Sequence, residues 1–164
     1  MALYNFSFGS NMSSNRLLAR LPEVKRMGTA RLMGYELTFD MVSLDGSGRC
    51  SIKESVEPGA QVYGVVYQLT PAEKEILDGI EGPRYDCVDV EVILLDGKKV
   101  TAHCYIANTT DASILPYDWY IEHVHRRALE AGLPNEYSEK IKSRPTRQDS
   151  DKVRAAVEFA VHQQ

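Results

Sequence analysis

Residues 62–69 constrain the fold most strongly, because all of them except Gly64 and Gln68 are β-branched, aromatic or aliphatic. A dense run of this composition is typical of a buried strand. Thr70-Pro71-Ala72-Glu73 follows at once, with a threonine suited to cap a helix, a proline at the first helical position and a glutamate that completes a capping box. The sequence therefore predicts a buried strand that leads straight into a helix, and Gly82-Pro83 ends that helix.

Alternating polarity and turn residues predict further elements on both sides of this unit. Tyr4, Phe6 and Phe8 share one face of residues 3–8, which is the period of a strand. Apolar residues at helical spacing recur along residues 117–131. We expect strands at residues 3–8, 31–42, 49–57, 88–92 and 100–107, and helices at residues 15–21, 71–81, 117–131, 136–141 and 151–164.

The order of these elements, with strands first and helices interspersed, favours an α+β fold around a mixed sheet or small barrel. The length of 164 residues suits one domain that spans residues 1–164. Residues 143–150 are rich in charge and are predicted to form a mobile loop before the C-terminal helix. In the helix at residues 71–81, we expect a buried apolar face made of Ala72, Ile76, Leu77 and Ile80.

Charge and cysteine content exclude several classes of function. Nineteen basic and twenty-three acidic residues give a formal charge of −4, and no basic stripe suited to nucleic acid is present. No apolar run reaches the length that spans a membrane. Cys50, Cys87 and Cys104 are odd in number and lack CxxC spacing, so we expect reduced thiols. These features predict a cytoplasmic location, with neither nucleic acid nor membrane as a partner.

The turn Phe8-Gly9-Ser10-Asn11-Met12 is the first local feature that could carry chemistry, because it joins the first strand to the first helix. Such a turn can aim backbone N–H groups at one point, where they could hold a carboxylate or a developing oxyanion. The alternative interpretation is an ordinary strand-to-helix turn, in which Gly9 and Asn11 only supply conformational freedom.

Glu81 is the second such feature, because it stands at the C-terminal end of the predicted helix. The negative end of the helix dipole disfavours ionisation of a carboxyl group there. Partial burial would raise its pKa further, toward the range of a general base near neutral pH. The alternative interpretation is one more solvated acid on a helix that is rich in acidic residues.

The histidines do not form a convincing metal or nucleophile site. His123 and His125 are two positions apart on a predicted helix, so they point in different directions. His103 and Cys104 are neighbours on a predicted strand and face opposite sides, which excludes a nucleophile–base pair.

Several segments together resemble the signature of a known family. Residues 5–12 are similar to a YxAYGSN opening motif, and residues 62–69 are similar to a VwGvvy strand. Leu77-Asp78-Gly79-Ile80-Glu81-Gly82, with Tyr85 after it, resembles an LDxxEG…Y segment. The other matches are a strand tyrosine in Cys104-Tyr105-Ile106, Tyr120 in a closing helix, and a GLPxEY tail at residues 131–137. In this order, from residue 3 to residue 142, they resemble the γ-glutamylcyclotransferase-like proteins of the AIG2-like superfamily.

This resemblance implies a small mixed β-barrel flanked by helices. It also implies a lyase or acyltransferase activity of glutathione metabolism, in which the α-amine of a γ-glutamyl amino acid attacks the γ-carbonyl and releases 5-oxoproline and an amino acid. The implied partner is a small γ-glutamyl substrate, with no metal and no cofactor. Glu81 is the implied catalytic acid and base. The implied substrate-binding residues are Asn5, Phe6, Ser7, Phe8, Gly9, Ser10, Asn11, Tyr105 and Tyr120.

Some positions depart from the family pattern. Phe8 stands where the family usually has tyrosine, Asn5 replaces a commonly aromatic residue, and the segment between Glu81 and Tyr85 is shorter. The sequence therefore leaves two alternatives for the leaving group, which are an amino acid and an amine or other conjugate. A non-catalytic protein that binds a small molecule with the same fold is the alternative from another class. The assembly is open between a monomer and a homodimer.

Overall fold

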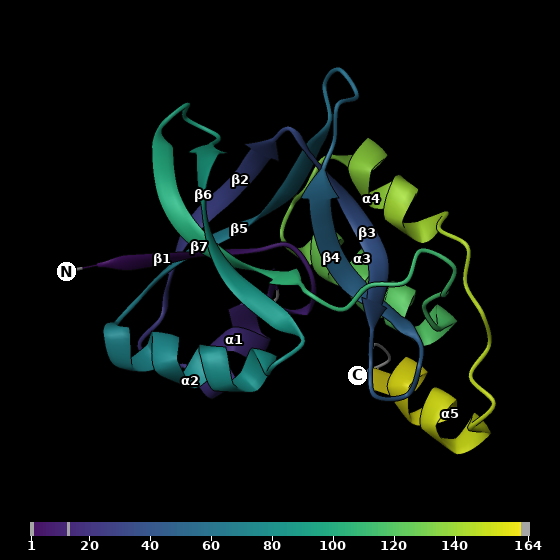
Figure 1. Cartoon of the computed structure of the whole chain (residues 1–164). Helices are drawn as coiled ribbons and strands as arrows, with labels where there is room; N and C mark the ends of the chain where they lie inside the picture. The colour runs from purple at the N-terminus through teal and green to yellow at the C-terminus, as the bar shows by residue number, and fades with distance from the viewer. Residues whose placement is uncertain (1, 13, 162–164) are drawn as a thin grey trace.

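The fold is a closed barrel of five strands with helices around it, in a computed structural model that describes residues 2–12 and 14–161 (Figure 1). The elements in chain order are β1 (Leu3–Ser7), the 3-10 turn η1 (Ser10–Met12), α1 (Ser14–Arg20), β2 (Lys25–Met33), β3 (Tyr35–Val42), β4 (Gly48–Glu54), β5 (Gln61–Leu69), α2 (Pro71–Glu81), β6 (Tyr85–Leu94), β7 (Lys99–Ala107), α3 (Asp118–Glu130), α4 (Asn135–Lys142) and α5 (Lys152–Ala160). Figure 1 shows α1 and α2 together at one end of the barrel, with α3 and α4 near the β3–β4 hairpin. The expected α+β fold with a small mixed barrel and flanking helices is confirmed.

The barrel closes between its first and its last strand. The strand order is β1-β5-β2-β6-β7, and β1 lies antiparallel to β5 but parallel to β7, where Asn5 faces His103. The strands β6 and β7 form the hairpin expected from the sequence, with Gly97 in the turn at a φ of +89°. The N-terminal strand β1 therefore lies between β5, from the middle of the chain, and β7, the last strand of the barrel.

The apolar run at residues 62–69 forms the buried strand β5, as predicted. Val62, Val65 and Val66 are fully buried. Gly64 lies where β1 passes closest, since a Cβ atom at this position would stand 2.3 Å from the Ser7 carbonyl oxygen and 2.8 Å from Cε1 of Phe6. Only a residue without a side chain lets β1 approach so closely.

The capped helix α2 forms as predicted. The prediction of which of its residues are buried is mostly wrong. Leu77 is buried, whereas Ala72 is exposed and Ile76 and Ile80 remain 51% and 41% exposed. Glu73 is buried instead. The side of α2 that carries Glu73 faces the interior, because the side chain of this capping residue also reaches into the structure.

The Glu73 carboxylate ties α2 to a distant segment. It accepts the backbone N–H of Thr70 at 3.0 Å through one oxygen and the backbone N–H of Glu23 at 3.2 Å through the other. Thr70 in turn accepts the Glu73 N–H at 3.2 Å, which completes the capping box. This reciprocal arrangement satisfies helix-end donors and fixes the start of α2.

The single strand expected at residues 31–42 is wrong, because two strands from different sheets cover this region. The strand β2 begins at Lys25 and belongs to the barrel, whereas β3 pairs with β4. Gly34 separates them at a φ of +81°. The sequence signal was missed because the first residues of β2, from Lys25 onward, are exposed and show no apolar alternation.

Residues 143–150 pack against α3 through specific hydrogen bonds. The indole N–H of Trp119 donates to the buried carboxylate of Asp149 at 3.0 Å, and the backbone N–H of Arg147 donates to the carbonyl of Pro116 at 3.0 Å. The mobility of this loop stays a prediction. The helix expected at residues 151–164 spans Lys152–Ala160, and residues 162–164 lie outside the described part of the chain.

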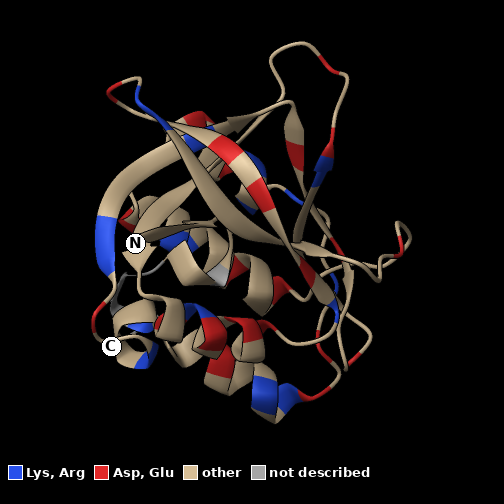
Figure 2. Ribbon diagram, turned by 60° about the vertical axis from the view of Figure 1, so that its left-hand side comes forward, with Lys and Arg blue, Asp and Glu red and all other residues tan. Residues whose placement is uncertain are grey.

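Charged residues of both signs are mixed over the surface. Figure 2 shows Lys and Arg interspersed with Asp and Glu on both strands and helices. Among the described residues, no helix has both the length and the apolar character needed to cross a membrane.

Candidate active site

Glu81 is the last residue of α2, at the wall of a cavity. The capping box holds the first turn of the helix, and at the other end Gly82 adopts a φ of 78° and donates its N–H to the carbonyl of Asp78. Both ends of the helix are therefore fixed, and the Glu81 side chain projects from its C-terminal end. The helix dipole disfavours a negative charge at this end.

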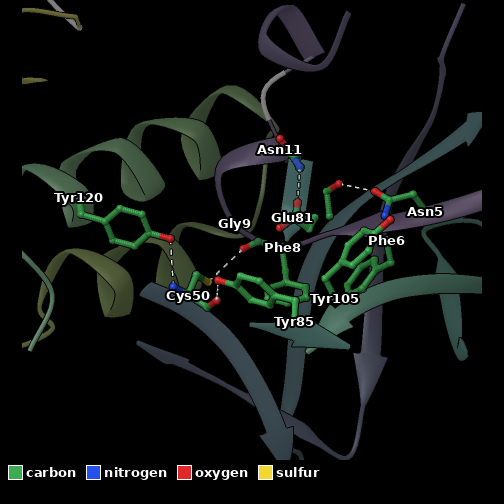
Figure 3. Close-up of a pocket in the computed structure, with 11 residues that line it drawn as sticks. Asn5, Phe6, Phe8, Gly9, Asn11, Cys50, Glu81, Tyr85, Tyr105 and Tyr120 are labelled. Carbon is green, nitrogen blue, oxygen red and sulfur yellow. Dashed lines mark hydrogen bonds between the residues drawn. The ribbon is translucent and has the colours of Figure 1, made fainter. Parts of the chain in front are cut away.

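A hydrogen bond from Asn11 holds the Glu81 carboxyl. The side-chain amide of Asn11 donates to Oε1 of Glu81 at 2.9 Å, across 70 residues of chain (Figure 3). Burial raises the pKa of Glu81 above its usual value of 4.5, and the charges of Arg20 and Arg16 and the Asn11 hydrogen bond oppose that rise. A carboxyl in this state can exchange a proton nearer to neutral pH than a solvated acid.

The cavity beside Glu81 gathers the residues that the sequence singled out. It has a volume of about 60 Å³, several times the roughly 10–15 Å³ that one water needs. Most of the predicted site residues line it, and the Ser10 side chain lies outside what the structure describes. The lining residues are Asn5, Phe6, Ser7, Phe8, Gly9, Asn11, Cys50, Glu81, Tyr85, Tyr105 and Tyr120.

The polar residues of β1 are locked to one another and to β7. The Ser7 hydroxyl donates to Oδ1 of Asn5 at 2.5 Å, and the Asn5 amide donates to the carbonyl of His103 at 3.4 Å. Both side chains are buried. Both the oxygen and the nitrogen of the Asn5 amide are hydrogen-bonded. The orientation of these polar atoms at the cavity wall is therefore set before any ligand arrives.

Tyr105 presents an acceptor to the cavity. Its hydroxyl donates to Oδ1 of Asp78 at 2.6 Å, so its proton is already engaged. Burial and the neighbouring Asp78 raise the pKa of the Tyr105 phenol well above its usual range, which keeps the hydroxyl protonated. Asp78 is also paired with Lys74 at 3.0 Å. The free lone pairs of the Tyr105 oxygen can therefore accept a hydrogen bond from a cationic group.

Tyr120 and Tyr85 contact the backbone of the same residue, Cys50 on β4. The hydroxyl oxygen of Tyr120 accepts the backbone N–H of Cys50 at 3.0 Å, and the hydroxyl of Tyr85 donates to the Cys50 carbonyl at 3.0 Å (Figure 3). Burial raises the pKa of both phenols beyond their usual range. Within the described part of the chain the Tyr120 O–H has no acceptor, so it could donate to a carboxylate or an anionic oxygen.

Sequence reasoning did not place Tyr85 and Cys50 in the site. Tyr85 was visible in the segment that follows Glu81, and its spacing could have assigned it to the pocket. Cys50 gave no local signal, because it enters from the β3–β4 hairpin, outside the barrel. Burial raises the pKa of its thiol far above the usual range, so it is not a reactive nucleophile.

A larger cleft is also lined by Glu81. This outer cleft has a volume of about 730 Å³ and shares Asn11, Glu81, Tyr85 and Tyr120 with the inner cavity. Glu81 therefore borders both spaces. The basic residues that line the outer cleft are Arg16, Arg20, Arg49, Arg84 and Arg154.

His123 and His125 line neither the inner cavity nor the outer cleft. Nε2 of His123 lies 2.7 Å from Oε2 of Glu158, and His125 is buried on the same helix. Within residues 2–12 and 14–161, no group of three or more His, Cys, Asp or Glu side chains is arranged to hold a metal ion.

Comparison with known proteins gives concordant matches in sequence and structure. Residues 61–141 match the model of the AIG2-like family. The human and mouse proteins named gamma-glutamylcyclotransferase are each 32% identical over 146 residues, which cover 84% of this chain and 76% of theirs. A solved structure named gamma-glutamyl cyclotransferase superposes with a TM-score of 0.86 at 27% identity and covers all of both chains.

Proposed function

Since this chain belongs to the γ-glutamylcyclotransferase family, we propose that it converts γ-glutamyl-L-amino acids into 5-oxoproline and a free amino acid, with Glu81 as the acid and base. The observation that carries this assignment is the Glu81 carboxyl, which is fixed by Asn11 at the boundary of two cavities and has a raised pKa. The reaction forms one bond, between the α-nitrogen and the γ-carbonyl carbon, and breaks the amide bond to the leaving amino acid.

Glu81 supplies the proton transfers that this exchange needs. The α-ammonium must lose a proton before its nitrogen can attack, and the leaving nitrogen must gain one before it departs. One carboxyl can perform both steps when it contacts both nitrogens, and a side chain that lines both the inner cavity and the outer cleft is suited to that task. Such proton transfer contributes roughly 10²- to 10⁴-fold to a rate.

The inner cavity is suited to hold the γ-glutamyl group in a folded conformer. Its walls combine the rings of Phe6 and Phe8 with the fixed polar groups of Asn5 and Tyr105. Confining a flexible chain so that amine and carbonyl meet removes much of the entropic barrier to ring closure. The Tyr105 oxygen, whose proton is held by Asp78, would accept a hydrogen bond from the α-ammonium.

The turn after β1 is suited to the negative charge that develops during attack. The N–H of Met12 closes this turn onto the carbonyl of Gly9 at 3.1 Å, so residues 9–12 form one compact unit that leads into α1. Backbone N–H groups of such a turn would stabilise the anionic carbonyl oxygen or the glutamyl carboxylate. The steps are proton transfers and acyl exchange, and the proposal includes neither a metal nor a cofactor.

The cellular setting that we propose is cytoplasmic, within glutathione metabolism, where γ-glutamyl amino acids arise. Three reduced cysteines support this setting, since Cys50, Cys87 and Cys104 are all free thiols.

The direct test is product release from γ-glutamyl-L-alanine, measured by chromatography of both products. We expect 5-oxoproline and alanine in equal amounts. The control substrate is α-glutamyl-L-alanine, which has the same atoms but cannot release alanine by closing a ring onto the γ-carbon. Turnover of both dipeptides would indicate a general peptidase, and turnover of neither would contradict the proposed function.

Replacing Asp78 by alanine should lower kcat/KM about 10- to 100-fold, which corresponds to the roughly 1.5–3 kcal/mol of a hydrogen bond to a charged group. The reason is that Asp78 accepts the Tyr105 proton at 2.6 Å and thereby orients the phenol oxygen. Asp78→Asn keeps an acceptor and should restore most of the activity. Lys74→Met, which removes only the ion pair on the solvent side, is the matched control. Equal losses in Asp78→Asn and Asp78→Ala would exclude this positioning role.

A further inference from the structure

The outer cleft, which Glu81 also lines, carries an excess of positive charge. Five arginines line it, against the carboxylates of Asp45 and Glu81. The whole chain, by contrast, is mildly acidic, with a formal charge of −4. A local charge opposite to the net charge indicates a site that is suited to an anion.

Three of these arginines are already committed to partners in the protein. Arg49 lies 3.3 Å from Asp45 and over the ring of Tyr120. Arg154 lies 2.6 Å from Asp149. Arg84 donates to the carbonyl of Val42. These side chains shape the cleft but have few donors left for a ligand.

Arg16 and Arg20 line this cleft together with Glu81. They are four residues apart on α1 and therefore share one face of the helix. Both lower the pKa of Glu81 against the effect of burial, and the influence of Arg20 is the larger. Arg20 is exposed to solvent and forms no salt bridge with the residues that the structure describes.

A bound anion would offset the mutual repulsion of these two cations. Burial lowers the pKa of Arg16, and the like charges of Arg20 and Arg127 lower it further, whereas Tyr120 and Glu158 raise it. Guanidinium groups that repel one another beside a partly buried carboxyl are stabilised when a second anion joins them. A carboxylate is the natural occupant, since it can accept two parallel hydrogen bonds from one guanidinium.

We propose that Arg20, supported by Arg16, binds the α-carboxylate of the leaving amino acid and thereby selects γ-glutamyl amino acids over γ-glutamylamines. This inference rests on the proposed function. In a γ-glutamyl amino acid the carboxylate sits on the carbon bonded to the leaving nitrogen. Once Glu81 reaches that nitrogen, the carboxylate must lie close to the Glu81 carboxyl, where Arg16 and Arg20 are. A γ-glutamylamine leaves this position empty.

The test compares two substrates that differ only in the carboxylate, γ-glutamyl-L-alanine and γ-glutamylethylamide. Arg20→Gln should lower kcat/KM for the alanine substrate roughly 10-fold, mainly through KM, because it removes one partly solvated charge-assisted contact. The ethylamide should change less than about twofold by the same reasoning. Arg20→Lys, which keeps the charge but not the two-pronged geometry, should fall between the wild type and Arg20→Gln.

The pair of substrates separates this inference from two other outcomes. Loss of Arg20 also removes a charge that acts on the pKa of Glu81, but that effect would slow both substrates alike and would move the pH profile. An unchanged ratio of kcat/KM for alanine over ethylamide would therefore overturn the assignment of Arg20. Arg31→Gln, at an exposed position on β2 outside the cleft, is the control that should alter neither value. If the wild type acts on neither substrate, the proposed function fails instead.

Discussion

Glu81→Gln should lower kcat for 5-oxoproline release by about 10²- to 10⁴-fold, the range that general acid–base catalysis contributes. Glutamine keeps the size of the side chain and the oxygen that accepts the Asn11 amide at 2.9 Å. It loses only the proton that moves between the two nitrogens. Substrate affinity, measured by isothermal titration with the inactive variant, should therefore stay near that of the wild type.

Glu75→Gln is the matched control, because Glu75 is an exposed acid on the same helix. It should retain full activity. More than a tenth of wild-type kcat in Glu81→Gln would exclude Glu81 as the acid and base. A loss of substrate binding together with kcat would assign it a structural role.

The raised pKa of Glu81 gives the same variant a pH signature. Activity that needs the ionised carboxyl should rise with pH through a midpoint above 4.5. For stability, the folded state binds the Glu81 proton more tightly than the unfolded state. The wild type therefore loses free energy of unfolding as pH rises from the unfolded pKa through the folded one. Urea titrations should show Glu81→Gln gaining stability relative to the wild type over that interval, and an equal difference at every pH would contradict the shift.

Gly64→Ala should destabilise the protein by about 3 kcal/mol, at the upper end of what an added methyl costs in a packed core. The reason is the approach of β1, which would leave the new Cβ atom 2.3 Å from the Ser7 carbonyl oxygen and 2.8 Å from Phe6. For a chain of this length, that cost corresponds to a melting temperature lower by roughly 6–12 °C. Activity should fall as well, because Phe6 and Ser7 line the inner cavity.

Gly79→Ala provides the contrasting control within α2. Nothing lies within 4 Å of a Cβ atom at Gly79. Alanine there should stabilise the helix by about 0.5–1 kcal/mol, since glycine is the poorer helix former. Thermal unfolding of both variants would settle the comparison, and a Gly64→Ala protein as stable as the wild type would mean that β1 can move away without loss.

The elements with strong local signals were predictable from the sequence. The capping box of Thr70 and Glu73 and the stop at Gly82 define α2 in any context, because their hydrogen bonds are made within the helix ends. The resemblance to the family then implied the barrel and the location of Glu81. Residue patterns alone had already put Glu81 at the end of its helix and had left a mixed sheet and a small barrel as alternatives, since closure of the barrel depends on strands far apart in the chain.

The features that were missed depend on contacts between distant segments. Ile76 and Ile80 look like a buried face, but the orientation of α2 is set by Glu73 bonding to Glu23, which no local pattern encodes. Cys50 joins the cavity because the β3–β4 hairpin reaches it from outside the barrel. The same holds for Arg20, whose position beside Glu81 depends on how α1 and α2 meet.

The parallel pairing of β1 with β7 also determines when the site can form during synthesis. Asn5 meets His103 across 98 residues, so the first strand of the barrel must wait during synthesis for the last strand of the barrel. Until then, one edge of β1 is without its partner and the wall of the cavity is incomplete. Contacts of such long separation make folding slow relative to a helical protein of similar size. We therefore expect ligand binding to appear in a single late step, after β7 has emerged, with no partly competent intermediate before it.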